Sequence, residues 1–400
     1  MSTETKVISD IVVERRGNAG LITLNRPKAL NALSLQMVRD LSAALLDLRD
    51  DPQVALVAIR GTNKLGRPGS PESRFGGFCA GGDIRFFHQA GLADDSALED
   101  FFTEEYALNH LIHTYPKPYI AFLDGVVMGG GMGLCQGVSQ ATPTGNADDG
   151  AGQVNPAAHA HGTKVRIVTE HTKMAMPETN IGLFPDVGGG YFLSRCPGHV
   201  GEYLALTGEV IGADEAIGFG LADIKRAAAS LPALWEELAT QPFASSTAAE
   251  QWIATELIAD AARSTGATGK IDTYFSLLRV KHMVDALEGA QDDPWAAKIA
   301  AILRKRSPLM LHVALEQIRR ARSMSLADDL RMERDMVYQC FHLRPGADGE
   351  TIEGIRALAI DKDYTPKWQP ARIEDVKPGM ADAFFVSPWS AHAHPLQHLV

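Results

Sequence analysis

The sequence predicts a mixed α/β protein that continues into a helical C-terminal region. Two patterns support this: β-rich runs alternate with helical stripes over residues 1–230, and large apolar side chains recur at helical spacing from about Ser230 onward. The composition, 45% hydrophobic and 22% charged, suffices to bury a core. Because 400 residues exceed the usual size of one simple domain, we expect an α/β core over 1–230 and a helical region over 231–400 packed on it.

The α/β part opens with the order strand, strand, helix, strand. Ile11–Glu14 and Leu21–Leu24 are short β-rich runs around Gly17–Gly20, which predicts a hairpin. Ser34 can cap a following helix whose apolar residues recur at helical spacing. Val54–Ile59 is a nearly continuous apolar strand.

The same pattern then returns further along the chain. Asp100–Tyr115 carries an apolar stripe and predicts a helix, Tyr119–Val127 predicts a strand, and a helix is expected to begin at Gly130. Val165–Thr169 and Lys173–Met176 predict two more short strands. Recurring strand–strand–helix units indicate a layered or coiled α/β arrangement.

Two later segments have distinct compositions. Ser307–Pro308 is a typical helix start, with a capping serine and a proline at the first helical position. Gln140–His161 contains three glycines and two prolines, with Val154 as its only large apolar residue. We expect this segment to be a mobile surface loop.

Charge and cysteine usage exclude several classes of protein. The net charge is −11 and there is no run of Lys or Arg, which argues against a nucleic-acid surface. The first ten residues lack the pattern of a targeting segment, and no apolar stretch is long enough to cross a bilayer. The four cysteines are scattered singly, as in a reducing compartment, so we expect a cytoplasmic protein without membrane contact.

Two glycine-rich segments are candidates for binding a carbonyl oxygen. They are Phe78–Ile84 and Gly125–Gly133, each of which leads into a predicted helix. Glycine lets backbone N–H groups approach a ligand closely, and at a helix start these groups lack partners and favour negative charge. Two such segments facing each other could stabilise an oxyanion, although each alone could equally be a tight turn.

A third segment, Met176–Gly190, places Glu178 and Asp186 eight residues apart in apolar, turn-rich surroundings. Apolar neighbours raise the pKa of a carboxyl group and suit it to act as a base or a nucleophile. The structural alternative is that Glu178 caps a turn and Asp186 caps a helix that starts near Val187.

Together these segments resemble the crotonase (enoyl-CoA hydratase/isomerase) superfamily, and more closely the 3-hydroxyisobutyryl-CoA hydrolases. The resemblance covers nearly the whole chain, and the match from Glu178 to Gly190 is its most specific part. The other matching segments are Asn25–Leu33, Ala80–Arg85, Glu104–Tyr106, Met128–Gly133, Leu204–Gly208, Glu353–Ala357 and Ile360–Trp368.

The resemblance implies a crotonase-like β-β-α spiral core and a ligand held through coenzyme A. It places the oxyanion hole on the N–H groups of Gly82 and Gly130, the catalytic carboxylates on Glu178 and Asp186, and a substrate-binding glutamate on Glu105. Independently, Glu105 lies on the predicted buried stripe of its helix, where a carboxylate needs a partner or a function. The coenzyme A contacts implied by the resemblance are Arg26, Lys28, Ala29, Leu30, Ala80, Gly82 and Asp83.

Gly133 discriminates between the activities of the superfamily. Enoyl-CoA hydratases use two glutamates, one of which would fall on Gly133, so the resemblance favours hydrolysis of a short 3-hydroxyacyl-CoA thioester, as in valine catabolism. Glu178 would attack the carbonyl or activate a water, while Asp186 and Glu105 orient the hydroxyl group. The alternatives are an enoyl-CoA hydratase or isomerase that uses Glu178, and a non-catalytic acyl-CoA binding protein.

The expected partner is a small-molecule acyl-CoA, and a homo-oligomer is left open. No metal or redox cofactor is required, because coenzyme A is part of the substrate. His159 with His161, and His392 with His394 and His398, lie in segments rich in alanine and proline and without neighbouring ligands, which argues against a metal site.

Overall fold

The computed structural model describes residues 4–8, 10–63, 77–136, 162–258, 268–290 and 292–400. The chain divides into two compact units: unit 1 contains residues 1–81, 108–174 and 211–266, and unit 2 contains residues 82–107, 175–210 and 267–400. Helix α3 (Ala97–His113) contributes its first part to unit 2 and its last part to unit 1. The predicted division at residue 230 stays a prediction, and the predicted loop Gln140–His161 lies outside the described residues.

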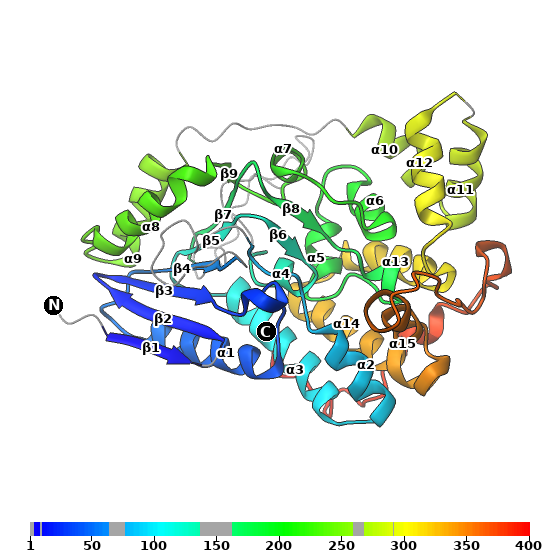
Figure 1. Cartoon of the computed structure of the whole chain (residues 1–400), viewed down its shortest axis with the longest axis horizontal. Helices are drawn as coiled ribbons and strands as arrows, with labels where there is room; N and C mark the ends of the chain where they lie inside the picture. Colours follow the sequence, from blue (N-terminus) through cyan, green and yellow to red (C-terminus); the bar gives the residue numbers. More distant parts are fainter. Residues whose placement is uncertain (1–3, 9, 64–76, 137–161, 259–267, 291) are drawn as a thin grey trace. The chain divides into compact units, whose positions relative to one another are not determined.

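Unit 1 is built on a seven-stranded sheet with the order β1-β2-β3-β4-β5-β7-β9 (Figure 1). The first three strands are antiparallel, and the predicted hairpin is confirmed, with Ile11 paired to Leu24. From β3 to β9 the neighbours are parallel. The strands are β1 (Glu4–Ile8), β2 (Ile11–Arg16), β3 (Ala19–Leu24), β4 (Leu56–Gly61), β5 (Tyr119–Leu123), β7 (Lys164–Val168) and β9 (Ile224–Lys225).

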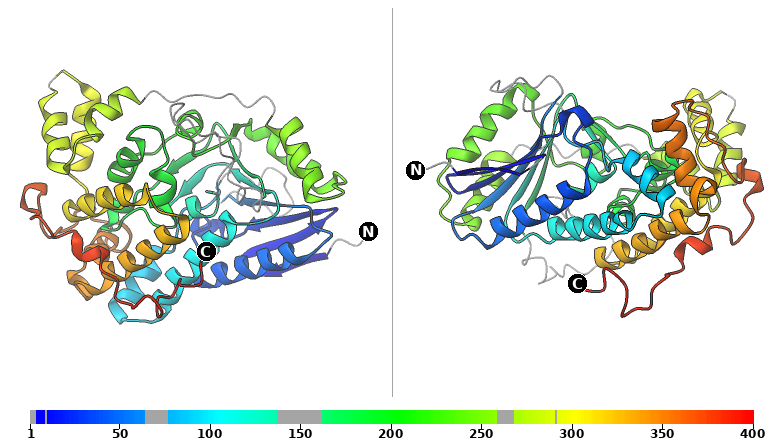
Figure 2. Two further views of the ribbon diagram at one scale, coloured as in Figure 1. Left: turned by 180° about the vertical axis from the view of Figure 1, so that it is seen from behind. Right: turned by 60° about the horizontal axis from the view of Figure 1, so that its bottom comes forward.

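Helices cover both faces of this sheet (Figure 2). Ala19 and Leu21 pack into a core with Trp235 of α8. On the opposite face Gly20 lies so close to α1 that a Cβ there would be 2.7 Å from Cδ2 of Leu48. This alternation along β3 is what a strand buried on both faces requires. The helices of unit 1 are α1 (Leu35–Asp50), α4 (Gly130–Gly133), α7 (Ala213–Gly218), α8 (Leu231–Thr240) and α9 (Ser246–Trp252).

The strand predicted over Tyr119–Val127 is in fact two strands. Gly125 has φ +74° and interrupts the extended chain after β5. The chain then continues as β6 (Val126–Met128), which pairs with β8 (Lys173–Ala175) in a separate two-stranded sheet. The positive φ favours glycine, and the break sets the direction in which the chain enters the triple-glycine segment.

Unit 2 is helical over its described residues. The predicted helix start at Ser307 is confirmed, because its hydroxyl accepts a hydrogen bond from the N–H of Met310 at 3.2 Å. Phe87, Phe101, Phe102 and Phe341 pack ring against ring in its interior. The helices are α2 (Ile84–Ala93), α5 (Gly189–Leu193), α6 (Val200–Thr207), α10 (Gly269–Phe275), α11 (Val280–Gly289), α12 (Pro294–Leu303), α13 (Pro308–Ala321), α14 (Leu326–His342) and α15 (Glu350–Ile355).

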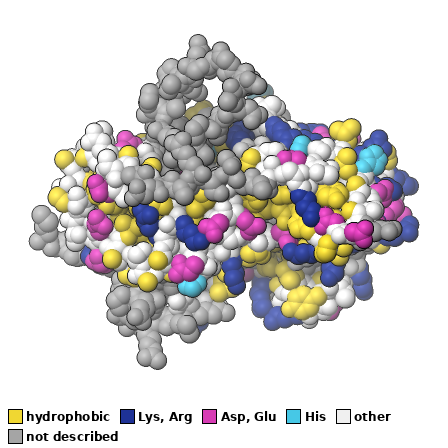
Figure 3. Space-filling view, turned by 90° about the horizontal axis from the view of Figure 1, so that it is seen from above, with side chains coloured by type: hydrophobic (Ala, Val, Ile, Leu, Met, Phe, Trp, Pro, Cys, Tyr) yellow, Lys and Arg dark blue, Asp and Glu magenta, His cyan; other side chains and the backbone are white. Residues whose placement is uncertain are grey.

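The observed elements confirm a mixed α/β protein with a helical C-terminal region. On the face drawn in Figure 3, basic and acidic side chains are mixed rather than gathered by sign. Within the described ranges, no helix combines the length and the apolar character needed to cross a membrane.

Candidate active site

Three buried carboxyl groups form the centre of the candidate site, all within unit 2. Glu105 lies on α3, Glu178 is the first residue of the 3₁₀ helix η4 (Glu178–Ile181), and Asp186 lies in the loop between η4 and α5. Only 2%, 6% and 5% of their respective surfaces are exposed. Carboxyl groups are rarely buried without a partner or a function, so the cluster is the candidate for a functional site.

Tyr106 is the direct partner of Asp186. Its hydroxyl donates a hydrogen bond to Oδ2 of Asp186 at 2.9 Å, and the tyrosine side chain is fully buried. The role of Tyr106 was not predicted from the sequence. Its one signal there is its position next to Glu105 on the predicted helix.

Burial raises the pKa of all three carboxyl groups, and repulsion between carboxylates adds to the rise at Glu105 and Glu178. Burial raises the pKa of Glu105 well above its ordinary range, and the charges of Asp186 and Glu178 add to the effect. The pKa of Glu178 is likewise raised, first by burial and then by Asp186. Burial raises the pKa of Asp186 to about 7, and the hydrogen bond from Tyr106 opposes the rise. Each of the three carboxyl groups therefore binds its proton more strongly than an exposed carboxyl group does.

The geometry argues against a merely structural role for the two acids of the loop. Helix α5 has Gly188 at its N-cap, and the carboxylate of Asp186 accepts its hydrogen bond from Tyr106 instead of capping the helix. Oε2 of Glu178 and Oε1 of Glu105 are buried and accept no hydrogen bond from any described residue. These oxygens are free to accept protons from a ligand, as a base or a hydroxyl-binding group must.

The turn that carries Glu178 is fixed from both ends. Gly182 ends η4 with φ +69°, and a Cβ there would lie 2.2 Å from the carbonyl oxygen of Glu350. The hydroxyl of Thr351, on α15, donates to the carbonyl of Gly182 at 2.7 Å. At the other end, the hydroxyl of Thr179 donates to the carbonyl of Leu206 on α6 at 3.2 Å. Such support restricts the direction in which the carboxyl group of Glu178 can point.

The two glycine-rich segments run side by side within unit 1. Cys79 pairs with Val127 in a parallel bridge, and the N–H of Met128 donates to the carbonyl of Cys79 at 3.0 Å. A Cβ on Gly131 would lie 2.4 Å from that same carbonyl oxygen, so only glycine allows this approach. As expected, the two segments lie next to each other, in their parts Cys79–Gly81 and Val126–Gly131.

Gly82 and Gly130, the predicted oxyanion donors, belong to unit 2 and unit 1 respectively. Gly130 is the first residue of α4, where an N–H has no partner within the helix. Gly81, directly before Gly82, has φ +102°, and a Cβ on it would lie 3.4 Å from the nitrogen of Gly130. The joint use of Gly82 and Gly130 on one oxygen stays a prediction.

The predicted coenzyme A residues of unit 1 are gathered around one turn. The N–H of Ala80 donates to the carbonyl of Leu30 at 3.1 Å, which places the turn containing Lys28 and Ala29 against the first glycine-rich segment. Lys28 and Leu30 are exposed and available to a ligand. Arg26 instead donates to the carbonyl of Ala32 at 2.8 Å and so stabilises its own turn.

Asp83, in unit 2, has a local role as the N-cap of α2. Its carboxylate accepts a hydrogen bond from the N–H of Phe86 at 3.4 Å. Its proposed contact with coenzyme A remains a prediction.

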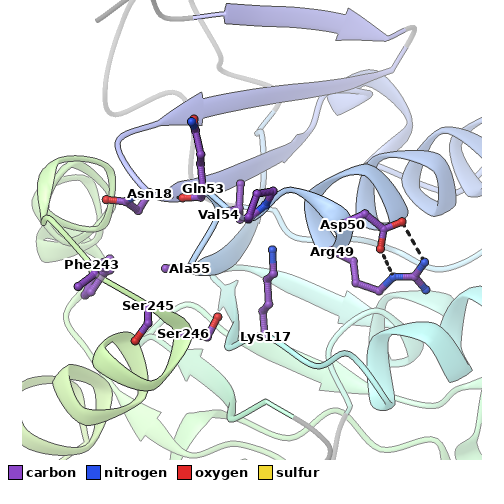
Figure 4. Close-up of a pocket in the computed structure, with 12 residues that line it drawn as sticks. Asn18, Arg49, Asp50, Gln53, Val54, Ala55, Lys117, Phe243, Ser245 and Ser246 are labelled. Carbon is purple, nitrogen blue, oxygen red and sulfur yellow. Dashed lines mark hydrogen bonds and ion pairs between the residues drawn. The ribbon is translucent and has the colours of Figure 1, made fainter.

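A surface pocket of about 250 Å³ in unit 1 contains none of the predicted site residues (Figure 4). In it Lys117 donates to the carbonyl groups of Leu48 and Asp51 at 2.7 and 2.6 Å, at the C-terminus of α1. A cation there stabilises the helix end. Arg49 and Asp50 are paired with each other at 2.8 Å. The fold thus accounts for the three charged side chains of this pocket.

Comparison with known proteins shows the family of this chain. The family model for enoyl-CoA hydratase/isomerase matches residues 19–147 and 157–385. The chain is 36% identical over 397 residues to the 3-hydroxyisobutyryl-CoA hydrolase, mitochondrial, of Gallus gallus, covering 95% of this chain and 90% of that protein. It is 34% identical over 385 residues to the probable 3-hydroxyisobutyryl-CoA hydrolase 3 of Arabidopsis thaliana, covering 94% and 91%.

Solved structures with the same fold include two that cover nearly the whole chain. A carnitinyl-CoA dehydratase from Mycobacterium thermoresistibile has a TM-score of 0.75 at 33% identity and covers 94% of this chain and 96% of its own. An enoyl-CoA hydratase from Rhodobacter sphaeroides also has a TM-score of 0.75 at 33% identity, covering 95% and 98%. The chain therefore belongs to the enoyl-CoA hydratase/isomerase family, and within it to the group of the 3-hydroxyisobutyryl-CoA hydrolases.

Proposed function

We propose that this protein hydrolyses the thioester of a short 3-hydroxyacyl-CoA, with 3-hydroxyisobutyryl-CoA as its substrate. The observation that carries the proposal is the buried cluster of Glu105, Glu178 and Asp186 with Tyr106 bonded to Asp186. A protein that only binds acyl-CoA has no need to bury three carboxyl groups whose pKa values are raised. The names of the curated relatives support the choice of substrate.

In the proposed mechanism the N–H groups of Gly82 and Gly130 stabilise the oxyanion that develops on the thioester carbonyl. A proton passes within the cluster from Glu178 to Asp186, which leaves the carboxylate of Glu178 free to react. Glu178 then either bonds to the carbonyl carbon, giving a mixed anhydride that water later cleaves, or removes a proton from a water that attacks. In both routes the carbon–sulfur bond breaks, and Asp186 returns its proton to the departing coenzyme A thiolate.

Glu105 has a separate role in this scheme. Burial raises the pKa of Glu105 well above its ordinary range, which favours the protonated form, and a protonated Glu105 can donate a hydrogen bond to the 3-hydroxyl group of the substrate. A neutral carboxylic acid both donates and accepts, which suits a hydroxyl group that does the same.

An enoyl-CoA hydratase activity is the second candidate, because the two solved relatives are a dehydratase and a hydratase. Against it stands Gly133, which lies buried in α4 and supplies no carboxyl group where the hydratases are expected to have one. Assignment to valine catabolism, a cytoplasmic location, and the absence of a metal or redox cofactor are part of the proposal.

The reaction is tested by incubating the purified protein with 3-hydroxyisobutyryl-CoA, 3-hydroxypropionyl-CoA, acetyl-CoA and crotonyl-CoA. Free thiol is followed with a thiol reagent, and loss of the conjugated absorbance of crotonyl-CoA is followed in parallel. We expect thiol release from the two 3-hydroxyacyl substrates. Loss of the enoyl absorbance without thiol release would show that the protein is a hydratase and not a hydrolase. If neither signal changes although the protein still binds acyl-CoA, the protein is a binding protein.

A further inference from the structure

The loop that carries Asp186 has a strained backbone. Val187 and Gly188, directly after Asp186, both have positive φ, at +57° and +83°. For a β-branched residue such as Val187 this conformation is unfavourable, so neighbouring groups must hold it in place. Val187 is 3% exposed, which leaves little room for water to stabilise the loop.

A carboxylate from α14 binds this loop from within unit 2. Oε2 of Glu333 accepts a hydrogen bond from the N–H of Gly188 at 2.7 Å, and Oε1 accepts one from the N–H of Gly190 at 2.9 Å. Glu333 is fully buried. It thus bridges the loop and the first turn of α5, where N–H groups have no partner within the helix.

Two further residues complete the support. The amide of Gln317, on α13, donates to Oε1 of Glu333 at 3.0 Å and to the carbonyl of Pro185 at 2.6 Å. The carboxylate of Asp329 accepts a hydrogen bond from the N–H of Tyr191 at 2.8 Å. Gln317 and Asp329 are also fully buried. The backbone on both sides of Asp186 is therefore bound to one buried polar network.

We propose that Glu333, oriented by Gln317, is a positioning residue. It holds the strained loop so that Asp186 keeps its hydrogen bond from the hydroxyl of Tyr106. Among the described residues, Glu333 bonds to the backbone of the loop, to Gln317 and to its neighbour Asp329, so it acts on the reaction through Asp186. This inference rests on the proposed function for its activity readout, but its structural readout does not depend on any substrate.

A purely structural cap would not require this arrangement. Burying a carboxyl group is unfavourable until its hydrogen bonds compensate, and the network buries two, Glu333 and Asp329. The N-cap position itself is Gly188, whose φ of +83° disfavours a capping side chain. A buried acid that binds the backbone two and four residues after a catalytic carboxylate fixes its position more tightly than an exposed cap could.

The test compares Glu333→Gln with Glu202→Gln. Glu202 is another fully buried glutamate of unit 2, paired with Arg322 at 2.6 Å and without a hydrogen bond to the 185–191 loop among the described contacts. Glu333→Gln keeps the shape but turns one acceptor into a donor that faces a backbone N–H. Gln317→Met serves as a second variant that leaves Glu333 intact if Glu333→Gln does not fold.

Two readouts are measured on the full-length protein: amide hydrogen exchange of the segment 186–191, and thiol release from 3-hydroxyisobutyryl-CoA normalised to the folded fraction. We expect Glu333→Gln to speed exchange at Gly188 and Gly190 at least about tenfold and to lower kcat about ten- to a hundredfold, with KM changed less than about threefold. Glu202→Gln should change neither exchange in this segment nor kcat by more than about twofold, and Gln317→Met should fall between them.

Unchanged exchange in the segment, or a kcat equal to that of Glu202→Gln, would overturn the positioning role. A wild-type protein that releases no thiol would instead refute the proposed function, while the exchange readout would still decide whether Glu333 holds the loop. Failure of the inference and failure of the proposed function are therefore distinguishable.

Discussion

Replacing Tyr106 by phenylalanine tests how the site sets the ionisation of Asp186. The substitution removes the hydroxyl that donates to Oδ2 of Asp186 at 2.9 Å and leaves the buried ring in place. A hydrogen bond to a charged group contributes about 1.5–3 kcal/mol, which corresponds to about one to two pKa units. Burial raises the pKa of Asp186 to about 7 in the presence of that bond. In Tyr106→Phe we expect it to lie about one to two units higher.

The assay is thiol release from 3-hydroxyisobutyryl-CoA between pH 5.5 and 9.5, corrected for spontaneous thioester hydrolysis. The acidic limb of kcat/KM reports the free enzyme, so its midpoint should move from near pH 7 in the wild type to about 8 or 9 in the variant. The control is Tyr119→Phe, which loses a buried hydroxyl bonded at 3.0 Å to the carbonyl of Leu134 and not to a carboxylate.

An acidic limb that stays in place in Tyr106→Phe would refute the reasoning, because the hydrogen bond would then not favour the ionised form of Asp186. A limb that moves equally in Tyr119→Phe would show that loss of any buried hydroxyl has the same effect. Either result would show that the contact between Tyr106 and Asp186 does not set the pH dependence of the reaction.

Three further predictions follow from the same structure. Burial raises the pKa of Asp186 from 3.8 to about 7, so the buried charge destabilises the folded state by an amount that is absent below about pH 4 and grows as the pH rises towards 7. Asp186→Asn should therefore raise the free energy of unfolding at pH 8 by about 1–3 kcal/mol and change it little at pH 4. Urea unfolding at the two pH values measures this difference. Gly190→Ala would place a Cβ 2.3 Å from Oδ1 of Asp329, and should lower the free energy of unfolding by about 1–3 kcal/mol together with kcat. Lys28→Ala removes an exposed cation from the predicted coenzyme A turn, and should raise KM severalfold with kcat unchanged. An unchanged KM would show that Lys28 does not contribute to binding of coenzyme A.

Much of the fold was predictable because local signals and tertiary packing agree. The caps Ser34 and Ser307 begin helices where the sequence placed them, and the hairpin of β2 and β3 follows its two β-rich runs. The missed feature was the break at Gly125, although Asp124–Gly125 interrupts the apolar run with a pair that is typical of turns. Strand β1 was also missed, since it owes its place to pairing with β2.

The site was predictable where the residue type is unusual for its surroundings. Glu105, Glu178 and Asp186 are acids in apolar segments, and the structure buries all three. Tyr106 was missed because a tyrosine on a buried stripe is ordinary. Glu333 was missed because α14 contains several acids, and only the fold shows which of them turns inward to bind a loop some 140 residues earlier in the chain.

The most direct test of the account is the effect of Glu178→Gln on thiol release from 3-hydroxyisobutyryl-CoA. The variant keeps the size of the side chain but removes the group that attacks or activates water. We expect kcat to fall by at least about a thousandfold, while binding of the substrate, measured by calorimetry, stays within about threefold of the wild type. Thiol release that persists at the wild-type rate in a folded, substrate-binding Glu178→Gln protein would contradict the central claim that this carboxyl group performs the hydrolysis.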